Sequence, residues 1–234
     1  MQVLNEVHLS GLKKSYMRQA ALNGIDLHMK GPGMIGIVGP NGSGKSTLLK
    51  LMAGLIRPSS GQVKINNERI TRRSGETTAF LSEDDSLYRF LTVSKTLQFF
   101  HETVPEFDLT KAERMVTELK LPLDRKVKHL SKGNRARLKI VVTLARSVPV
   151  LCMDEPLSGL DPLVRQDILK MIIRYADIEN QLVFLSTHEV EEVEPFLDQV
   201  IIIQDGEVAL FGEVETLRQE RGMTVTELMR EVLA

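Results

Sequence analysis

The feature that most constrains this chain is a glycine-rich segment that runs into a lysine and a serine. It matches the P-loop pattern G-x-x-x-x-G-K-[ST] at every position and reads Gly39-Pro40-Asn41-Gly42-Ser43-Gly44-Lys45-Ser46. The apolar run 34–38 before it predicts a buried strand, and residues 45–52 after it predict a helix. Glycines let the backbone wrap a phosphate chain with inward N–H groups, to which the helix adds its positive end. The segment therefore predicts a phosphate-binding loop; a glycine-rich turn that only joins a strand to a helix is the alternative.

Side chains at the end of this segment suit a bound nucleotide and its metal ion. Lys45 would neutralise charge on the β- and γ-phosphates, and Thr47 would add a phosphate contact. The Ser46 hydroxyl is a fitting ligand for Mg²⁺, which prefers oxygen donors. We therefore expect ATP and Mg²⁺ as cofactors, with residues 39–47 around the nucleotide.

Two acidic residues form a second candidate group. Asp154 and Glu155 end the apolar run that begins at Val150, which places them at the carboxyl edge of a sheet, where ligands of such folds bind. Asp154 would hold Mg²⁺ through water, and Glu155 would polarise the attacking water as a general base. A pair of solvated acids that cap the next helix is the alternative.

Apolar runs that end at small or acidic residues recur along the chain and indicate its fold class. They predict buried parallel strands at 34–38, 78–81, 150–153, 182–185 and 200–203. Helical periodicity lies between them, at 45–52, 131–146 and 162–175. This alternation predicts a wound α/β sheet.

The remaining segments predict additions to that sheet. Looser alternation predicts strands that form an antiparallel edge on the sheet, at 3–9, 22–29 and 62–66. Asp205-Gly206 predicts a hairpin turn between two apolar runs. The aromatic and basic region 86–130 has helix patterns at 93–101 and 109–119, so we interpret it as a helical insertion. Two short helices are expected at 214–220 and 224–233.

Composition narrows the class of protein. The 30 Lys and Arg against 31 Asp and Glu give a net charge of -1, which argues against bulk nucleic-acid binding. The single cysteine, Cys152, lies in an apolar run and fits a packed thiol in a reducing compartment. No window approaches the ~20 apolar residues that cross a bilayer, and residues 1–10 lack a signal-peptide pattern. We expect one cytoplasmic folding unit that does not span a membrane.

The order of these motifs resembles that of ABC (ATP-binding cassette) ATPases. Ser158-Gly159-Leu160-Asp161 follows the acids directly, and His188 follows one strand later. In that family the Ser-Gly-Leu-Asp loop crosses to a partner subunit and the histidine contacts the γ-phosphate. Alone, His188 would more often be a helix-capping or surface histidine, but the shared order of motifs reverses that preference, and the resemblance implies these roles for Asp161 and His188.

Two segments depart from the family's usual pattern. The signature segment normally reads LSGGQ, and the matching stretch here is Leu130-Ser131-Lys132-Gly133-Asn134. Because Ser131 and Gly133 are kept, the resemblance implies that they bind a γ-phosphate; a plain serine N-cap is the alternative. Glu83 stands where the family usually has a glutamine that reaches Mg²⁺ and the attacking water, and its carboxylate can still coordinate the metal. Both departures look more like the exporter branches of the family.

The resemblance runs from Tyr16 to about Gly212 and implies a P-loop NTPase (RecA-like) core with an antiparallel β edge subdomain. The core would comprise residues 1–85 and 148–212, with a helical subdomain at 86–147 and C-terminal helices at 213–234. Tyr16 matches the aromatic residue that stacks on adenine in the family. A half-buried tyrosine at a strand end is the alternative.

The family's mode of action implies partners for this chain. Two cassettes meet head to tail, so Ser131 and Gly133 of one chain would close over the nucleotide held at Lys45 of the other. The resemblance implies a transporter ATPase, an exporter by the departures above, with a separate transmembrane permease subunit and no nucleic acid. The chain would lie on the inner face of the cell membrane.

A short apolar segment lies where the family receives a coupling helix from its membrane partner. It contains Leu87, Tyr88, Phe90 and Leu91, which alternatively form the core of the insertion. For the whole chain, a soluble ABC-type ATPase of the translation or DNA-repair kind is the competing function, and an unrelated P-loop enzyme such as a nucleotide kinase is another.

Overall fold

The computed structural model describes residues 5–17 and 19–233 of the chain. Val3 and Leu4 of one predicted strand, and Ala234 of the predicted C-terminal segment, lie outside the described residues. The strands form a six-stranded sheet and a separate four-stranded sheet. Among the residues described, no helix has the length and apolar character needed to cross a bilayer.

The six-stranded sheet has the order β10-β9-β3-β8-β7-β6 and contains all the predicted buried strands. Its strands are β3 (Gly33–Val38), β6 (Thr78–Leu81), β7 (Val150–Asp154), β8 (Leu182–Thr187), β9 (Gln199–Gln204) and β10 (Glu207–Glu213). Neighbours are parallel except β9 and β10, whose hairpin turns at Asp205-Gly206. Both turn residues have positive φ, 49° and 79°, as the tightest hairpins require. The predicted wound α/β fold class is confirmed.

This sheet is buried on both faces. In β3, Met34 and Val38 belong to one hydrophobic core, while Ile35 and Ile37 belong to a second core on the other face. Successive side chains of a strand point to opposite faces, so a continuous apolar run requires cover on both sides. The strands of this sheet therefore appear in the sequence as continuous apolar runs, because both of their faces are buried.

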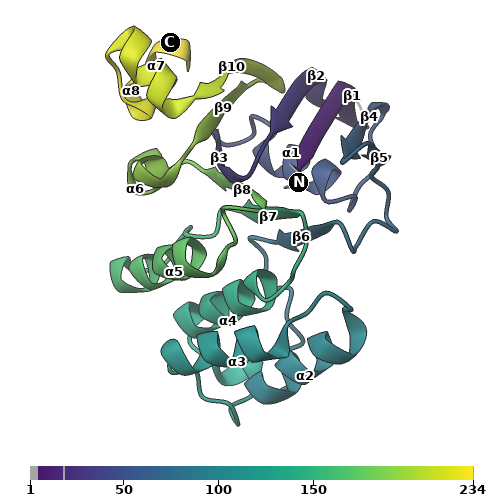
Figure 1. Cartoon of the computed structure of the whole chain (residues 1–234), viewed down its shortest axis with the longest axis vertical. Helices are drawn as coiled ribbons and strands as arrows, with labels where there is room; N and C mark the ends of the chain where they lie inside the picture. The colour runs from purple at the N-terminus through teal and green to yellow at the C-terminus, as the bar shows by residue number, and fades with distance from the viewer. Residues whose placement is uncertain (1–4, 18, 234) are drawn as a thin grey trace.

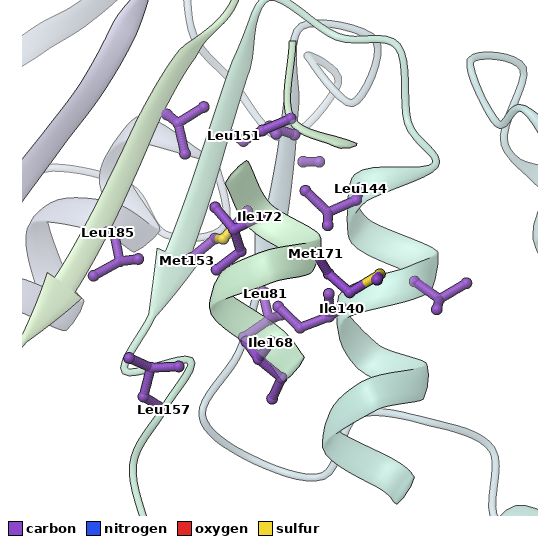
Figure 2. Packing of buried hydrophobic residues seen from close by; sticks show 14 of the residues in the cluster. Leu81, Ile140, Leu144, Leu151, Met153, Leu157, Ile168, Met171, Ile172 and Leu185 are labelled. Atoms are coloured by element: carbon purple, nitrogen blue, oxygen red, sulfur yellow. The ribbon is translucent and has the colours of Figure 1, made fainter. Parts of the chain in front are cut away.

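Helices α4 (Lys132–Leu144) and α5 (Pro162–Tyr175) cover the first face. Figure 2 shows Ile172 beside Met153 of β7, and Ile140 beside Met171 of α5, in this core. Pro162 suits the first turn of α5, where its missing N–H has no intrahelical partner to lose. The predicted helix 162–175 is confirmed, and the predicted helix 131–146 is confirmed with slightly shorter ends.

Helix α1 (Lys45–Met52) and the four-stranded sheet cover the second face. This sheet has the order β2-β1-β4-β5 and comprises β1 (Glu6–Tyr16), β2 (Gln19–Lys30), β4 (Ser60–Ile65) and β5 (Glu68–Arg69). The predicted antiparallel β subdomain is confirmed, but its strands form a separate sheet and not an edge of the main sheet. Their alternating pattern leaves one apolar face, which packs as a layer of its own against Leu48 and Leu49 of α1.

The predicted helical insertion lies at one end of the molecule and the last two helices lie at the other (Figure 1). The insertion contains α2 (Val93–Thr103), α3 (Leu109–Glu118) and a short 3₁₀ turn (Val127–His129), followed by α4. Leu87 is only 7% exposed and belongs to the first core. The prediction that Leu87 forms part of a docking surface is therefore wrong.

The last two helices, α7 (Val214–Arg221) and α8 (Val225–Leu233), are held by a buried carboxylate. Glu194 follows the short helix α6 (Val190–Val193) and accepts from Arg218 Nη2 at 2.7 Å and from the Val225 N–H at 3.0 Å. This contact gives the end of the chain, for which the sequence offered no motif, a structural anchor on the core.

We expect Cys152 to be unreactive in the folded protein. The side chain is buried in the second core, and burial raises the pKa of its thiol far above the usual range, with a further rise from nearby Asp154. Because the thiolate is the reactive form, labelling by a disulfide reagent at neutral pH should be at least about 10³-fold slower in the native than in the unfolded chain. Equal labelling rates with and without guanidinium would contradict the burial.

Candidate active site

Predicted site residues follow the ends of four adjacent strands of the six-stranded sheet. β3 runs into Gly39, β8 runs into His188, β7 ends at Asp154, and β6 runs toward Glu83. These strands are parallel and lie in the order β3-β8-β7-β6, so their carboxyl ends share one edge of the sheet. Residues from four separate parts of the sequence therefore meet in one place.

The loop between β3 and α1 adopts backbone conformations that favour glycine. Gly39, Gly42 and Gly44 have φ of 152°, 82° and 113°. A Cβ at Gly39 would lie 2.2 Å from the carbonyl oxygen of Ile203, and a Cβ at Gly44 would lie 2.7 Å from that of Ala21. Both contacts are too short for a side chain, so glycine is required at these two positions for the loop to keep its shape.

Lys45, the first residue of α1, is buried against this loop. Its Nζ donates to the carbonyl oxygens of Gly39 and Pro40 at 2.8 and 3.1 Å and lies 3.8 Å from Glu155 Oε1. Burial lowers the pKa of Lys45, and the nearby carboxylates of Glu155 and Asp154 partly oppose that effect. The site thus contains a desolvated amine whose charged form would gain from an anionic ligand.

Asp154 is the buried centre of a hydrogen-bond network. Its Oδ1 accepts from the hydroxyls of Ser46 at 2.7 Å and Ser186 at 2.9 Å. The Ser186 Oγ in turn accepts from the Glu155 N–H at 2.9 Å. Ser186 belongs to no motif and was not predicted from the sequence; the register between β7 and β8 brings it opposite Asp154.

Glu155 has a strained backbone and a side chain held on two sides. Its φ of 45° lies in the left-handed region, which costs about 1–2 kcal/mol for a residue with a Cβ. Its Oε2 lies 2.9 Å from His188 Nδ1, while its other oxygen faces Lys45. Such strain is commonly found at functional sites. A carboxylate fixed in this way is suited to accept a proton from a water molecule beside it.

A cavity of about 330 Å³ lies at this edge of the sheet. Its lining includes side chains predicted from separate motifs, namely Lys45, Ser46, Thr47, Glu83, Glu155 and His188. Asn41, Gly42 and Gly44 of the glycine-rich loop also line it. Ala21 and Ser158 line it as well, without having been predicted. The predicted phosphate-binding loop, Glu155 and His188 therefore surround one cavity.

Tyr16 is not among the residues that line this cavity in the described part of the chain. It ends β1, is 46% exposed, and has Lys14 Nζ 4.9 Å from its ring centre. Ala21, from the next strand, is the residue of this hairpin that reaches the cavity. Stacking of Tyr16 on adenine stays a prediction.

Ser131, Gly133 and Asp161 have structural roles within their own chain. Ser131 caps α4 by accepting from the Asn134 N–H at 3.2 Å, and Asp161 caps α5 by accepting from the Val164 N–H at 3.1 Å. A Cβ at Gly133 would lie 2.7 Å from Val164 Cγ2, so this glycine allows α4 to approach α5. Among the described residues, none of the three lines the 330 Å³ cavity. Their roles at a nucleotide stay predictions.

Lys139 is a further residue that the sequence analysis missed. It lines a second hollow, of about 200 Å³, which shares Glu83, Glu155 and Ser158 with the first cavity. Its Nζ donates to the carbonyl oxygens of Glu83 and Asp84, both at 2.9 Å, and burial lowers its pKa. Only helical periodicity marks Lys139 in the sequence, whereas the structure shows that it ties α4 to the loop that carries Glu83.

Substitution Lys139→Met should slow ATP hydrolysis by about tenfold, because it removes two hydrogen bonds worth ~1 kcal/mol each and loosens the Glu83 loop. Steady-state hydrolysis rates would measure this, with Lys95→Met on the exposed surface of α2 as the matched control. The loss should shrink when Glu83 is already alanine, because both changes act on one element. Fully additive losses would show that Lys139 does not act through Glu83.

Comparison with known proteins places the chain in a family. It matches the family described as ABC transporter over residues 22–158. An uncharacterized ABC transporter ATP-binding protein of Bacillus subtilis (strain 168) is 33% identical over 208 residues, which are 86% of this chain and 67% of the relative. A sulfate/thiosulfate import ATP-binding protein of Agrobacterium fabrum is 31% identical over 90% of this chain and 64% of the relative. The chain thus spans about two thirds of the length of these relatives.

A solved structure is also similar over nearly its whole length. It is described as an ATP binding subunit of an ABC transporter, with a TM-score of 0.84 and 26% identity over 97% of this chain and 99% of that chain. The similarity includes both the core and the inserted helices, and it confirms the predicted P-loop NTPase core.

Proposed function

This chain belongs to the ABC transporter family and is an ATPase, and on that premise we propose that it supplies energy to a separate membrane-spanning permease subunit. The observation that carries the proposal is that the glycine-rich loop, Lys45, Glu155 and His188 line one cavity together. Hydrolysis of a bound nucleoside triphosphate needs a site for the phosphates and a base beside the attacking water. In this proposal the glycine-rich loop with Lys45 is the phosphate site and Glu155 is the base.

Each side chain has a distinct task in this proposal. Lys45 binds the β- and γ-phosphates, and Glu155 accepts a proton from the attacking water. His188, 2.9 Å from Glu155 Oε2, keeps that carboxylate in position and contacts the γ-phosphate. Glu83, which lines the same cavity, orients the water. Tyr16 stacks on the adenine.

The proposed Mg²⁺ site has oxygen donors. Ser46 Oγ and Asp154 Oδ1 are 2.7 Å apart, and Glu83 lines the same cavity as Ser46. This donor chemistry fits a hard dication, which when bound would neutralise phosphate charge. In the described ranges no group of three or more His, Cys, Asp or Glu residues could hold a metal ion. Mg²⁺ would therefore take its remaining ligands from phosphate and water.

The proposed site is completed by a second cassette, identical or related. Ser131 and Gly133 lie at the N-terminus of α4, outside the cavity of their own chain, and Asp161 lies at the N-terminus of α5. A helix N-terminus binds anions well, so a γ-phosphate held by one chain is a suitable ligand for the exposed signature segment of another. Asp161 would cross to the partner at the same interface.

Light scattering of the Glu155→Gln variant tests this dimer. With ATP present and hydrolysis blocked, the mass should double, and without ATP the chain should return to a monomer. A Glu155→Gln variant that also carries Ser131→Arg should stay monomeric, because the arginine fills the space for the partner's nucleotide. Persistent monomers of Glu155→Gln with saturating ATP would contradict the composite site.

The permease is proposed to dock on the exposed aromatic pair Tyr88 and Phe90. These side chains are 51% and 68% exposed, and their ring centres are 5.7 Å apart. Tyr88 also packs edge-on against Phe99 of α2. An exposed aromatic surface near the Glu83 loop suits an apolar helix of a partner. The chain would then lie on the inner face of the membrane.

Export is the proposed direction. Two features of the sequence support export because they resemble the exporter branches of the family. One is Glu83 in place of glutamine, and the other is the signature Leu-Ser-Lys-Gly. One relative described above is an import protein, so the direction depends on these residues alone. Inside-out vesicles that accumulate substrate when ATP is added outside would support export, and right-side-out vesicles that accumulate it would contradict it.

Affinity purification of the tagged chain from detergent-solubilised membranes tests the transport function. A stoichiometric polytopic membrane protein, identified by mass spectrometry, is the expected companion. The variant Tyr88→Ala with Phe90→Ala should lose this companion while it keeps its ATPase rate. Recovery of the chain alone, or with ribosomes or DNA, would instead favour a soluble ABC-type ATPase.

A further inference from the structure

A hollow of about 740 Å³ lies at the end of α1 opposite the glycine-rich loop. Its walls are the segments 51–63 and 69–73. None of the residues described here lines both this hollow and the 330 Å³ cavity. It is therefore a separate site, at the other end of the helix that begins with Lys45.

Four arginines line this hollow, and we name it the arginine hollow: Arg57, Arg69, Arg72 and Arg73. All four are exposed, and no acidic side chain lines the hollow in the described part of the chain. Within residues 5–17 and 19–233, their guanidinium groups take part in no hydrogen bond or ion pair. Residues 57–73 contain five basic residues and one acidic residue, in a chain of net charge -1. Four cations around one space repel each other, and an anion in that space would offset the repulsion.

The backbone holds two of these arginines at the rim. Ser74 N–H donates to the Thr71 carbonyl oxygen at 3.0 Å, and Thr71 N–H donates to Ser74 Oγ at 3.0 Å. Arg72 and Arg73 occupy the turn between these residues. The opposite wall is close: a Cβ at Gly54 would lie 2.4 Å from the Thr71 carbonyl oxygen. The walls of the arginine hollow are therefore packed against each other.

The floor of the arginine hollow is apolar. Leu51 and Val63 are buried beneath it, and Ile56 and Ile70 pack against the second core. Leu55, beside it in the chain, is 47% exposed. A cationic rim over an apolar floor suits a ligand that joins a phosphate to apolar groups, rather than a fully polar ion. Guanidinium groups recognise phosphate oxygens through paired hydrogen bonds.

We propose that the arginine hollow binds the phosphate of an anionic phospholipid headgroup at the membrane surface. The choice of a lipid source rests on the proposed function, which puts this chain beside a membrane-spanning subunit, and on the apolar floor. Bound lipid would orient the chain on the membrane before and while it contacts the permease.

Co-sedimentation with lipid vesicles tests this proposal on the purified full chain, without a permease. The chain should bind phosphatidylcholine vesicles that contain phosphatidylglycerol and should not bind phosphatidylcholine alone. Each arginine near an anionic surface changes partitioning by about 5-fold at low ionic strength, so Arg72→Gln with Arg73→Gln should weaken binding by about 30-fold. Arg114→Gln with Lys120→Gln, exposed on and after α3, is the control of equal charge and should lower binding only slightly. Both double variants should keep the basal ATPase rate, which shows that they fold.

Three outcomes would overturn the proposal. The first is equal binding to both kinds of vesicle, and the second is an equal loss in both double variants, which would indicate only general charge attraction. The third is binding of inorganic phosphate in solution, lost in Arg72→Gln with Arg73→Gln, without any co-sedimentation with phosphatidylglycerol vesicles, which would identify a free phosphate as the ligand. The proposed function can fail separately. If the tagged chain binds lipid vesicles as expected but no permease purifies with it, the proposed function is rejected and the arginine hollow remains a lipid site.

Discussion

Substitution Glu155→Gln should slow ATP turnover by about 10² to 10⁴ while ATP binding remains. Glutamine has the same shape but cannot accept the proton of the attacking water. The fold should survive, because the strained backbone at φ 45° and the hydrogen bond from Glu155 N–H to Ser186 do not depend on the carboxylate charge. Single-turnover hydrolysis and equilibrium binding of a fluorescent ATP analogue would separate the two effects.

The matched control for this variant is Glu179→Gln. Glu179 is exposed in the segment that precedes β8, at the amino end of the strand whose carboxyl end carries the site. It should hydrolyse ATP at the wild-type rate. Turnover of Glu155→Gln within a few-fold of wild type would refute the role of Glu155 as general base and turn attention to Glu83 or His188.

Substitution Lys45→Ala should lower kcat/KM for ATP by roughly 30- to 5000-fold, since truncating one partner of a buried charged pair costs about 2–5 kcal/mol. The melting temperature should stay the same or rise. Burial lowers the pKa of Lys45, which means that the fold disfavours its charged form, so loss of the amine removes a desolvation cost. Loss of activity without loss of stability distinguishes a ligand-binding cation from a structural one.

The pH dependence of stability gives a second test of Lys45. In the window just below the ordinary lysine pKa, the unfolded chain binds more protons here than the folded chain, so this residue makes stability rise with pH. Lys45→Ala should remove that contribution. Lys50→Ala, in the last turn of the same helix, should leave kcat/KM unchanged. Unfolding of the Lys45→Ala protein at a markedly lower temperature would contradict the assignment.

The sequence predicted the parts of the molecule that depend on local pattern. Buried parallel strands appear as short apolar runs because both faces of the main sheet are covered, as in β3 and β8. The P-loop and the acids after β7 are short motifs whose residues are neighbours in the chain. Because β3, β6, β7 and β8 are parallel, knowing where each strand ends was enough to expect their motifs at one sheet edge.

Contacts between distant segments could not be predicted in this way. Ser186 holds both Asp154 and Glu155, and Lys139 holds the Glu83 loop, yet neither residue belongs to a motif. Leu87 has the sequence character of a docking residue and is buried instead. In each case the partner is set by strand register or helix packing, which depends on the whole fold.

By itself, then, the amino-acid sequence determined the α/β class, the phosphate-binding loop and the identity of the acids, because apolar periodicity and turn chemistry act over a few residues. Only the tertiary structure decided that the antiparallel strands form a second sheet over α1, that Glu155 contacts His188, and that four arginines surround one hollow. These features arise from the burial of one surface against another, and residues far apart in the chain carry no local signal of which surface they will meet.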